Sequence, residues 1–266
     1  MKTVQSKDGT AIAFDQSGQG PALILVGGAF QHRATDPRTT QIAALLSAHF
    51  SVIHYDRRGR GDSGNTLPYA TERELEDLES LVIEVGGTAF VFAMSSGGAL
   101  ALDAAARNPG ISKLALYEPP FIVDASRTPL PNDYVERLER TLAVGGRGDA
   151  VAYAMSAAMG VPAEFVVGMR GEAFWADFEE VAHTLPYDGR LMGDTMSGKP
   201  LPVTRWSGVT VPTLVMDGAT SEPYQRNAVA ALTALLPNAQ RSSFDGQSHD
   251  IAPELLAPTL TAFFTA

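Results

Sequence analysis

Residues Ala89–Arg107 read AFVFAMSSGGALALDAAAR, and this stretch decides the fold. Its first six residues form an uninterrupted apolar run of a length typical of a fully buried strand. The Ala and Leu residues after Gly97 favour a helix whose small side chains let it pack closely on a sheet. Ser95 therefore stands in a sharp strand-to-helix turn, with the small residues Ala93 and Gly97 two positions before and after it. Such a turn strains the central serine and exposes its hydroxyl, which predicts a nucleophile at Ser95; its rival Ser96 falls where the helix begins.

The alternation of short apolar runs with longer helical patterns continues along the chain on both sides of this stretch. Strands are expected at Ala22–Val26, Ser51–Tyr55, Ala89–Met94, Lys113–Tyr117, Pro212–Met216 and Arg241–Phe244. Helices are expected at Ile42–Ala48, Glu72–Val85, Gly97–Arg107, Asn227–Leu236 and Pro253–Phe264. This pattern predicts an α/β fold with a mostly parallel central sheet and helices on both faces. A hairpin of Thr3–Gln5 and Ala11–Phe14 is expected to precede it.

Residues 122–205 interrupt the alternation. This stretch is helical in pattern, rich in Met and aromatic residues, and punctuated by prolines near both ends. We interpret it as a helical cap inserted into an α/β core made of residues 1–121 and 206–266. Most of its apolar side chains are expected to fill a small second core. A few, with Trp175 first among them, are expected to face the site, because apolar walls are typical of small-ligand pockets.

A serine hydroxyl is a poor nucleophile near neutral pH and needs a base, and histidine is the usual one. His249 follows the last predicted strand in a polar loop before the terminal helix. In this chain order that loop lies at the same sheet edge as the turn at Ser95, so His249 is the predicted base. Three other histidines, His49, His54 and His183, are expected to be structural. His32 follows the first glycine loop and is a candidate for the pocket wall.

Two backbone N–H groups are needed to hold the oxyanion that forms when a serine attacks a carbonyl. Ser96, directly after the nucleophile, is expected to supply one. The loop after the strand Ala22–Val26 is expected to supply the other, from Ala29 as first choice and Gly28 as second. Phe30 and Met94, which neighbour these positions, are predicted to line the substrate pocket.

Composition restricts the classes of partner and chemistry. The chain has 266 residues, 45% of them hydrophobic and 19% charged, which is enough to build one large domain. With 20 Lys and Arg against 30 Asp and Glu, the formal charge of −10 makes nucleic acid and membrane poor partners. The absence of cysteine excludes disulfides, thiolate metal sites and a cysteine nucleophile, and it fits a reducing cytoplasm.

Neither a targeting segment nor a cofactor site is expected. The first residues lack the apolar stretch of a signal peptide, so a cytoplasmic protein is predicted. No cluster of His, Asp or Glu has metal-ligand spacing, so no metal is expected. The loop Asp56–Gly64 is rich in Gly and Arg, but it lacks the ending of a phosphate-binding loop. Its charges are therefore expected to form a structural ion-pair network.

Taken together, these motifs resemble those of the α/β-hydrolase superfamily. Val26–Phe30 resembles the family's His-Gly-x-Pro loop, with Gly27 in place of the histidine, and Asp56–Ser63 resembles its Asp-x-x-Gly-x-Gly-x-Ser loop. The resemblance spans both halves of the predicted core and leaves the cap aside. It implies an α/β-hydrolase fold and a serine hydrolase that uses no cofactor.

The chain departs from the family at the acid of the triad. The commonest acid position in the family falls here on Ser221, which cannot orient a histidine as a carboxylate does. Glu118, after the preceding strand, lies where certain haloalkane dehalogenases and zearalenone-type lactone hydrolases carry their acid. The lactone hydrolases are also similar in the Ser-Ser-Gly turn, the Glu-x-Pro motif and an Ala-Thr-rich loop. The resemblance favours Glu118, with Asp217 and Glu222 left as alternatives.

The function expected from these residues is hydrolysis of an apolar carboxylic ester or lactone through an acyl-enzyme. Ser95, His249 and Glu118 would form the triad, in a monomer or a homodimer. A carbon–carbon bond hydrolase, and a thioesterase or acyltransferase, are alternatives on the same triad. A ligand-binding receptor with slow turnover is an alternative outside enzymology. The sequence does not identify the natural substrate.

Overall fold

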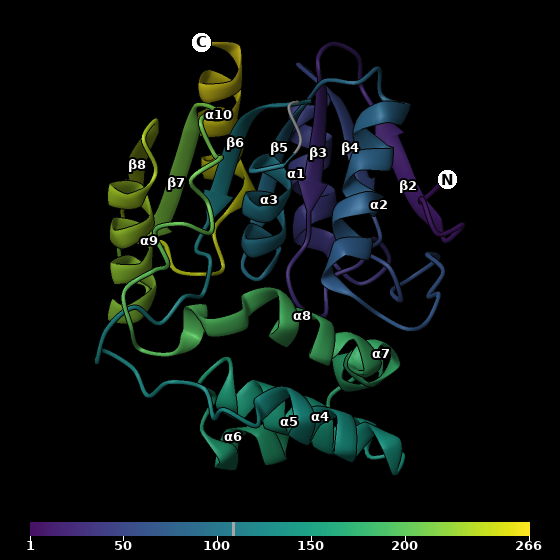
Figure 1. The fold of residues 1–266 in the computed structure, drawn as a ribbon, viewed down its shortest axis with the longest axis vertical. Helices are drawn as coiled ribbons and strands as arrows, with labels where there is room; N and C mark the ends of the chain where they lie inside the picture. Colours follow the sequence, from purple (N-terminus) through teal and green to yellow (C-terminus); the bar gives the residue numbers. More distant parts are fainter. Residues whose placement is uncertain (108–109) are drawn as a thin grey trace.

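A computed structural model describes residues 1–107 and 110–266, and its centre is an eight-stranded sheet (Figure 1). The strands are β1 (Lys2–Gln5), β2 (Ala11–Ser17), β3 (Ala22–Val26), β4 (Ser51–Tyr55), β5 (Ala89–Met94), β6 (Ile111–Tyr117), β7 (Thr213–Gly218) and β8 (Ala239–Phe244). Their order is β1-β2-β4-β3-β5-β6-β7-β8. β1 and β2 form an antiparallel hairpin, β2 pairs antiparallel with β4, and the remaining pairs are parallel. The predicted α/β fold with a mostly parallel sheet is confirmed.

Helices cover both faces of the sheet (Figure 1). One face carries α1 (Pro37–Leu46) and α10 (Pro253–Thr265), and the other carries α2 (Thr71–Glu84), α3 (Gly97–Ala105) and α9 (Pro223–Leu235). Successive side chains of β5 point to opposite faces of the sheet and so contribute to both apolar layers. Phe92 packs with α1 and α10, while Val91 packs with α2, α3 and α9. Both faces of the central strands are therefore buried, as expected for parallel strands.

Two of these helices begin several residues earlier than expected from hydrophobic pattern alone. In α1, Asp36 caps the first turn with its side chain and Pro37 occupies the first helical position. In α9, Glu222 and Gln225 form a reciprocal capping box around Pro223. The capping residues are polar, so they fall outside the apolar periodicity that marks the rest of each helix.

A helical insertion, residues 134–196, separates β6 from β7. It comprises α4 (Tyr134–Ala143), α5 (Arg147–Ala157), α6 (Ala163–Met169), α7 (Phe174–Val181), α8 (Leu185–Met192) and the 3-10 turns Ala182–Thr184 and Gly193–Met196. In Figure 1 it lies below the sheet, with α8 nearest to the sheet layer. A separate apolar cluster, including Leu138, Val151 and Trp175, fills its interior. The division of the chain into a core and a cap at residues 121 and 206 stays a prediction.

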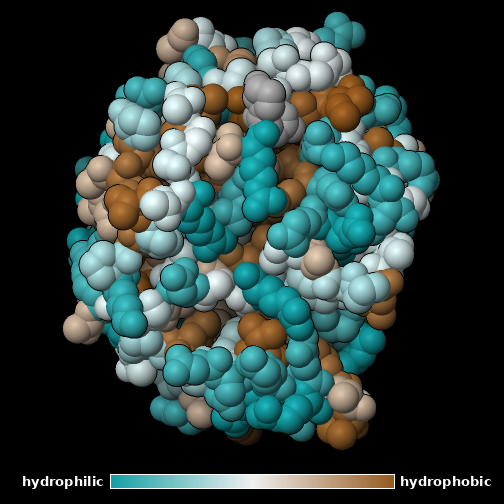
Figure 2. Space-filling view, viewed as in Figure 1, coloured by the Kyte–Doolittle hydropathy of each residue, from teal (hydrophilic) through white to brown (hydrophobic). Residues whose placement is uncertain are grey.

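Figure 2 shows hydrophilic side chains over most of one face, with apolar residues scattered among them. Among the described residues, no helix combines the length and apolarity that crossing a bilayer requires.

Candidate active site

Backbone strain gathers at one edge of the sheet. Within the described chain, three non-glycine residues have a positive φ: Phe30 at 64°, Ser95 at 52° and Glu118 at 45°. Each follows the carboxyl end of a strand, β3, β5 or β6, and these strands are neighbours in the sheet. Left-handed backbone is uncommon outside glycine and is often found at functional sites. The strained turn predicted at Ser95 is thus joined by strain on both sides of it.

Close packing between two loops explains why the turn needs small residues. A Cβ atom at Gly97 would lie 2.6 Å from the carbonyl oxygen of Gly27, and one at Gly28 would lie 2.8 Å from the Cβ atom of Ser95. Neither approach is possible for a larger residue without moving backbone. Glycine at these positions therefore lets the loop after β3 lie directly against Ser95.

His249 and Glu118 meet at this edge. The Nδ1 atom of His249 lies 2.8 Å from Oε2 of Glu118, whose side chain is fully buried. The other carboxylate oxygen of Glu118 accepts hydrogen bonds from the N–H of Gly218 and the hydroxyl of Ser221. Since Nδ1 faces the carboxylate, Nε2 is the ring nitrogen available to a serine hydroxyl.

Gln225 completes this group, and the sequence analysis missed it. Its Nε2 lies 3.0 Å from Oε2 of Glu118 and 3.2 Å from Nδ1 of His249. Its Oε1 faces the backbone N–H of Glu222 at 3.3 Å, which can only donate, so the amide nitrogen must face the carboxylate. With Nδ1 protonated, both Gln225 and His249 donate to the same oxygen. The sequence does contain the capping box that starts α9, which includes Gln225. A capping box marks the start of a helix, however, and does not indicate that this helix begins beside His249.

The alternative acids lie elsewhere. Asp217 is buried and forms an ion pair with Arg241, and Glu222 caps α9. Asp250 is exposed and pairs with Arg38. The structure therefore brings Glu118 to His249 and directs Asp217 away from it, while Ser221 donates a hydrogen bond to Glu118.

The candidate oxyanion donors differ in availability. Over residues 1–107 and 110–266, the N–H groups of Ala29 and Ser96 donate to no protein acceptor. The N–H of Gly28, by contrast, donates to Oε1 of Gln31. Gln31 is held in turn by Asp36, through a hydrogen bond of 2.6 Å. Ala29 and Ser96 are thus open to a ligand, and Gly28 is occupied.

The three predicted pocket residues lie in different surroundings. Phe30 stacks on Phe178 of α7, with ring centroids 4.3 Å apart, and so joins the loop after β3 to the helical insertion. Met94 is buried in the layer beneath α1 and α10, because it shares the face of β5 that Phe92 uses. Trp175 lies inside the insertion, and its Nε1 donates to Glu179. The side chain of Met94, the residue before Ser95, thus packs into the core, and Trp175 packs inside the insertion; their place in the pocket wall stays a prediction.

His32 is buried and lies just after the glycine loop that follows β3. Both of its ring nitrogens lack a hydrogen-bond partner in the part of the chain that the structure describes. Buried polar atoms of this kind are uncommon in folded proteins. The residue remains a candidate for the pocket wall. No group of His, Cys, Asp or Glu suited to a metal ion is present among the described residues.

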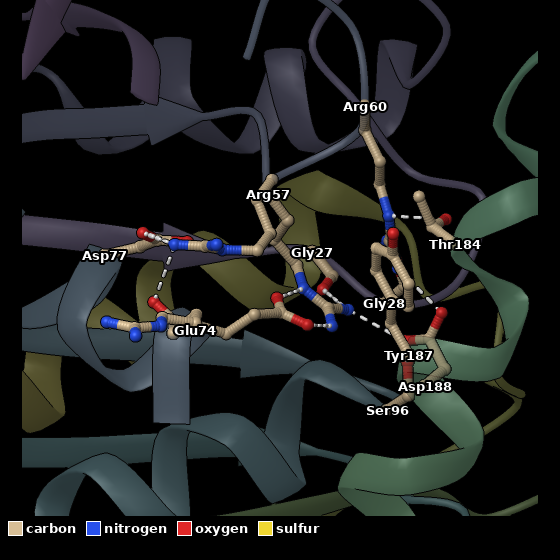
Figure 3. Close-up of polar contacts among 12 residues, drawn as sticks. Gly27, Gly28, Arg57, Arg60, Glu74, Asp77, Ser96, Thr184, Tyr187 and Asp188 are labelled. Atoms are coloured by element: carbon tan, nitrogen blue, oxygen red, sulfur yellow. Dashed lines mark hydrogen bonds and ion pairs between the residues drawn. The ribbon is translucent and has the colours of Figure 1, made fainter. Parts of the chain in front are cut away.

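The arginine-rich loop forms the expected ion-pair network, with one unexpected member (Figure 3). Arg57 pairs with Glu74 of α2, and Arg58 pairs with Asp77 of the same helix. The unexpected member is Asp188, which α8 contributes from the helical insertion.

Asp188 joins the insertion to the core. It lies 2.8 Å from Nη1 of Arg57 and 2.6 Å from Nη2 of Arg60. Burial by itself raises the pKa of Asp188, but Arg60, Arg57 and the Ser96 hydroxyl together lower that pKa below its ordinary value. Nothing in the local pattern of α8 marked Asp188, because its partners lie about 130 residues away in sequence.

Comparisons with known proteins place this geometry in context. The model of the alpha/beta hydrolase family matches residues 23–259. A non-heme chloroperoxidase of Streptomyces lividans is 26% identical over 282 residues, which cover 99% of each chain. An alpha/beta hydrolase of Sphaerobacter thermophilus is 49% identical, with a TM-score of 0.91 over 99% of this chain and 100% of that one. An enol-lactonase of Burkholderia xenovorans shares the fold, at 21% identity and a TM-score of 0.72 over the full length of both chains.

Proposed function

This chain belongs to the alpha/beta hydrolase family, and from that premise we propose that it hydrolyses a carboxylic ester or lactone through a triad of Ser95, His249 and Glu118. The observation that carries the proposal is the 2.8 Å contact between Nδ1 of His249 and a buried Glu118 carboxylate. That contact holds an imidazole with Nε2 free, at the sheet edge where Ser95 has a strained backbone. A base that an acid orients, at the same sheet edge as a serine hydroxyl, is the arrangement that acyl transfer requires.

The proposed reaction proceeds in two halves. His249 removes the proton from Ser95 as the serine oxygen attacks the carbonyl, and the N–H groups of Ala29 and Ser96 hold the oxyanion. The ester C–O bond then breaks, and His249 returns the proton to the leaving alkoxide. In the second half, His249 activates a water molecule, which releases the acid and restores Ser95. Glu118 orients the imidazole and stabilises its protonated form.

Two further observations support this assignment of parts. Glu118 accepts hydrogen bonds from Gly218, Ser221 and Gln225 and lies against Nδ1 of His249, so both of its carboxylate oxygens are held in place. Ala29 and Ser96 have N–H groups free of protein acceptors within the described chain.

We also infer that residues 122–205 act as a cap over the site, with the apolar substrate between cap and core. The support is the stacking of Phe30, in the loop after β3, on Phe178 of α7. Because Phe30 neighbours the proposed oxyanion donor Ala29, its partner in the insertion lies near the site. The names of the structural neighbours, which include an enol-lactonase and esterases, fit ester and lactone chemistry on this fold, but fold alone does not identify a substrate.

A substrate panel tests the proposal. Aryl esters, macrolactones, thioesters and a carbon–carbon diketone are assayed with the wild type and with Ser95→Ala. We expect turnover of esters or lactones that Ser95→Ala loses almost completely. Undiminished ester turnover by Ser95→Ala would contradict the triad. Turnover of the diketone or thioesters alone would replace the proposed reaction by one of its alternatives, and tight ligand binding with negligible turnover would indicate a receptor.

A further inference from the structure

A single buried carboxylate from the helical insertion touches groups on both sides of the proposed oxyanion hole. Oδ1 of Asp188 accepts hydrogen bonds from the Ser96 hydroxyl and from Arg57, each at 2.8 Å, and Oδ2 accepts one from Arg60 at 2.6 Å (Figure 3). Asp188 lies on α8, and its side chain is 9% exposed. It is therefore held by three donors from the core, two of them permanently charged.

One of these contacts fixes the first donor of the hole. Ser96 stands at the N-cap of α3, where a serine side chain ordinarily accepts a hydrogen bond from the N–H of the first turn. In the described part of the chain Ser96 makes no such bond, and its hydroxyl donates to Asp188 instead. The contact ties down the residue whose own N–H faces the oxyanion, and it leaves the N-terminus of α3 without a side-chain cap.

The second donor is reached through Arg60. Its Nη1 donates to the carbonyl oxygen of Gly28, and its Nε donates to Thr184 at 3.1 Å. The Gly28 carbonyl and the Ala29 N–H belong to the same planar trans peptide, so they point in opposite directions. A guanidinium on the carbonyl therefore fixes the direction of the Ala29 N–H, and it polarises that N–H into a stronger donor.

We propose that Asp188 is a positioning residue that aligns both N–H groups of the oxyanion hole, Ser96 directly and Ala29 through Arg60. This inference rests on the proposed function, because it assigns those two N–H groups to the oxyanion. It makes helix α8 of the insertion part of the catalytic geometry. The hole is then complete only while α8 sits against the core.

A neighbouring ion pair provides a control that distinguishes alignment of the oxyanion hole from a general contribution to stability. Arg58, in the same loop as Arg57 and Arg60, pairs with Asp77 of α2 through two hydrogen bonds, of 2.7 and 2.6 Å, and both side chains are buried. The remaining partners of Arg58 are Asp8 and the carbonyl oxygen of Arg73, and within the described chain neither is hydrogen-bonded to the loop after β3 or to the Ser95 turn. Asp77 thus provides a control with the same chemistry and without the contacts that carry the proposal.

The test compares Asp188→Asn with Asp77→Asn in the full-length protein, on the best ester of the substrate panel. We expect Asp188→Asn to lower kcat by about 10²-fold with little change in KM, because the contacts affected act in the transition state. An aryl boronic acid, which forms a tetrahedral adduct with a serine oxygen, should bind Asp188→Asn more weakly by a similar factor. Asp77→Asn should keep both the kcat and the boronate affinity of the wild type.

A milder variant covers the case in which Asp188→Asn fails to fold. Ser96→Ala removes only the hydroxyl that donates to Asp188, and it should lower kcat about tenfold, as the loss of a hydrogen bond to a charged group does. Unchanged kcat and boronate affinity in a folded Asp188→Asn, or in Ser96→Ala if Asp188→Asn does not fold, would overturn the positioning role. Labelling of Ser95 by a fluorophosphonate in the same samples separates the two proposals. An unlabelled wild type would overturn the proposed function itself.

Discussion

Two buried carboxylates flank the turn at Ser95 and Ser96, and their surroundings are opposite in kind. Glu118, on the β6 side, accepts hydrogen bonds from a backbone N–H, a hydroxyl, an amide and an imidazole. Asp188, on the β3 side, is held by two arginines and a hydroxyl. Among the residues that the structure describes, Glu118 thus has no permanently charged partner within hydrogen-bond distance, and Asp188 has two.

This difference matches the two tasks that the proposed reaction requires. Glu118 must stabilise a positive charge that appears only when His249 takes up a proton. A permanent cation beside Glu118 would repel that charge and so weaken the stabilisation of protonated His249. Asp188 exchanges no proton in the proposed reaction, and fixed cations keep it ionised and in place. A buried pair of charges is weak evidence for stability, but it does define a single geometry. The proposed site therefore separates the group that responds to proton transfer from the group that keeps the hole aligned.

Replacing Glu118 by Gln tests the comparison with the largest expected effect. The amide cannot stabilise a protonated His249 or select its tautomer, so kcat should fall by about 10⁴-fold while the fold is kept, as in the serine-protease triad. The matched control is Asp217→Asn, which changes a buried acid that pairs with Arg241. Steady-state kinetics and circular dichroism on both variants provide the measurement. If Asp217→Asn suffered the larger loss of kcat, the acid of the triad would be Asp217.

Replacing Asp188 by Asn tests the other side of the comparison through stability. Removing one partner of a buried ionic group leaves arginine charge uncompensated, and it should lower the free energy of unfolding by about 3–5 kcal/mol at neutral pH. Because the arginines lower the pKa of folded Asp188, its contribution is fully present above the unfolded pKa of about 3.9 and is lost as the pH falls through the lower folded value. Urea unfolding at pH 7, 5 and 3 measures this dependence. The gap between wild type and variant should stay constant from pH 7 to 5 and shrink only at the acid end; a gap that closes by pH 5 would contradict it.

Some of this site could be predicted from the sequence because its residues act locally. The Ser95 turn is encoded by adjacent residues, and the place of His249 follows from the chain order of the strands. The strain at Glu118 falls directly after a predicted strand, and the strain at Phe30 lies in the loop that follows another. These features depend on short-range pattern and on the fact that parallel strands end at a common edge.

Other parts could not be predicted because they depend on how distant segments pack. Gln225 reaches Glu118 only because the capping box starts α9 at Pro223, and Asp188 meets Arg57 and Arg60 only once α8 lies against the core. Trp175 illustrates the converse: an aromatic residue in the insertion is as well suited to its interior as to a pocket. Composition identifies such side chains as buried but not which cavity or core buries them.

The most direct test of the central claim is to map the site of covalent labelling. The wild type is treated with a fluorophosphonate, digested, and analysed by tandem mass spectrometry, with Ser95→Ala as the control. The account predicts one phosphonylated residue, Ser95, and no labelling of a folded Ser95→Ala protein. Modification at Ser96, or equal labelling of wild type and Ser95→Ala, would show that Ser95 is not the nucleophile.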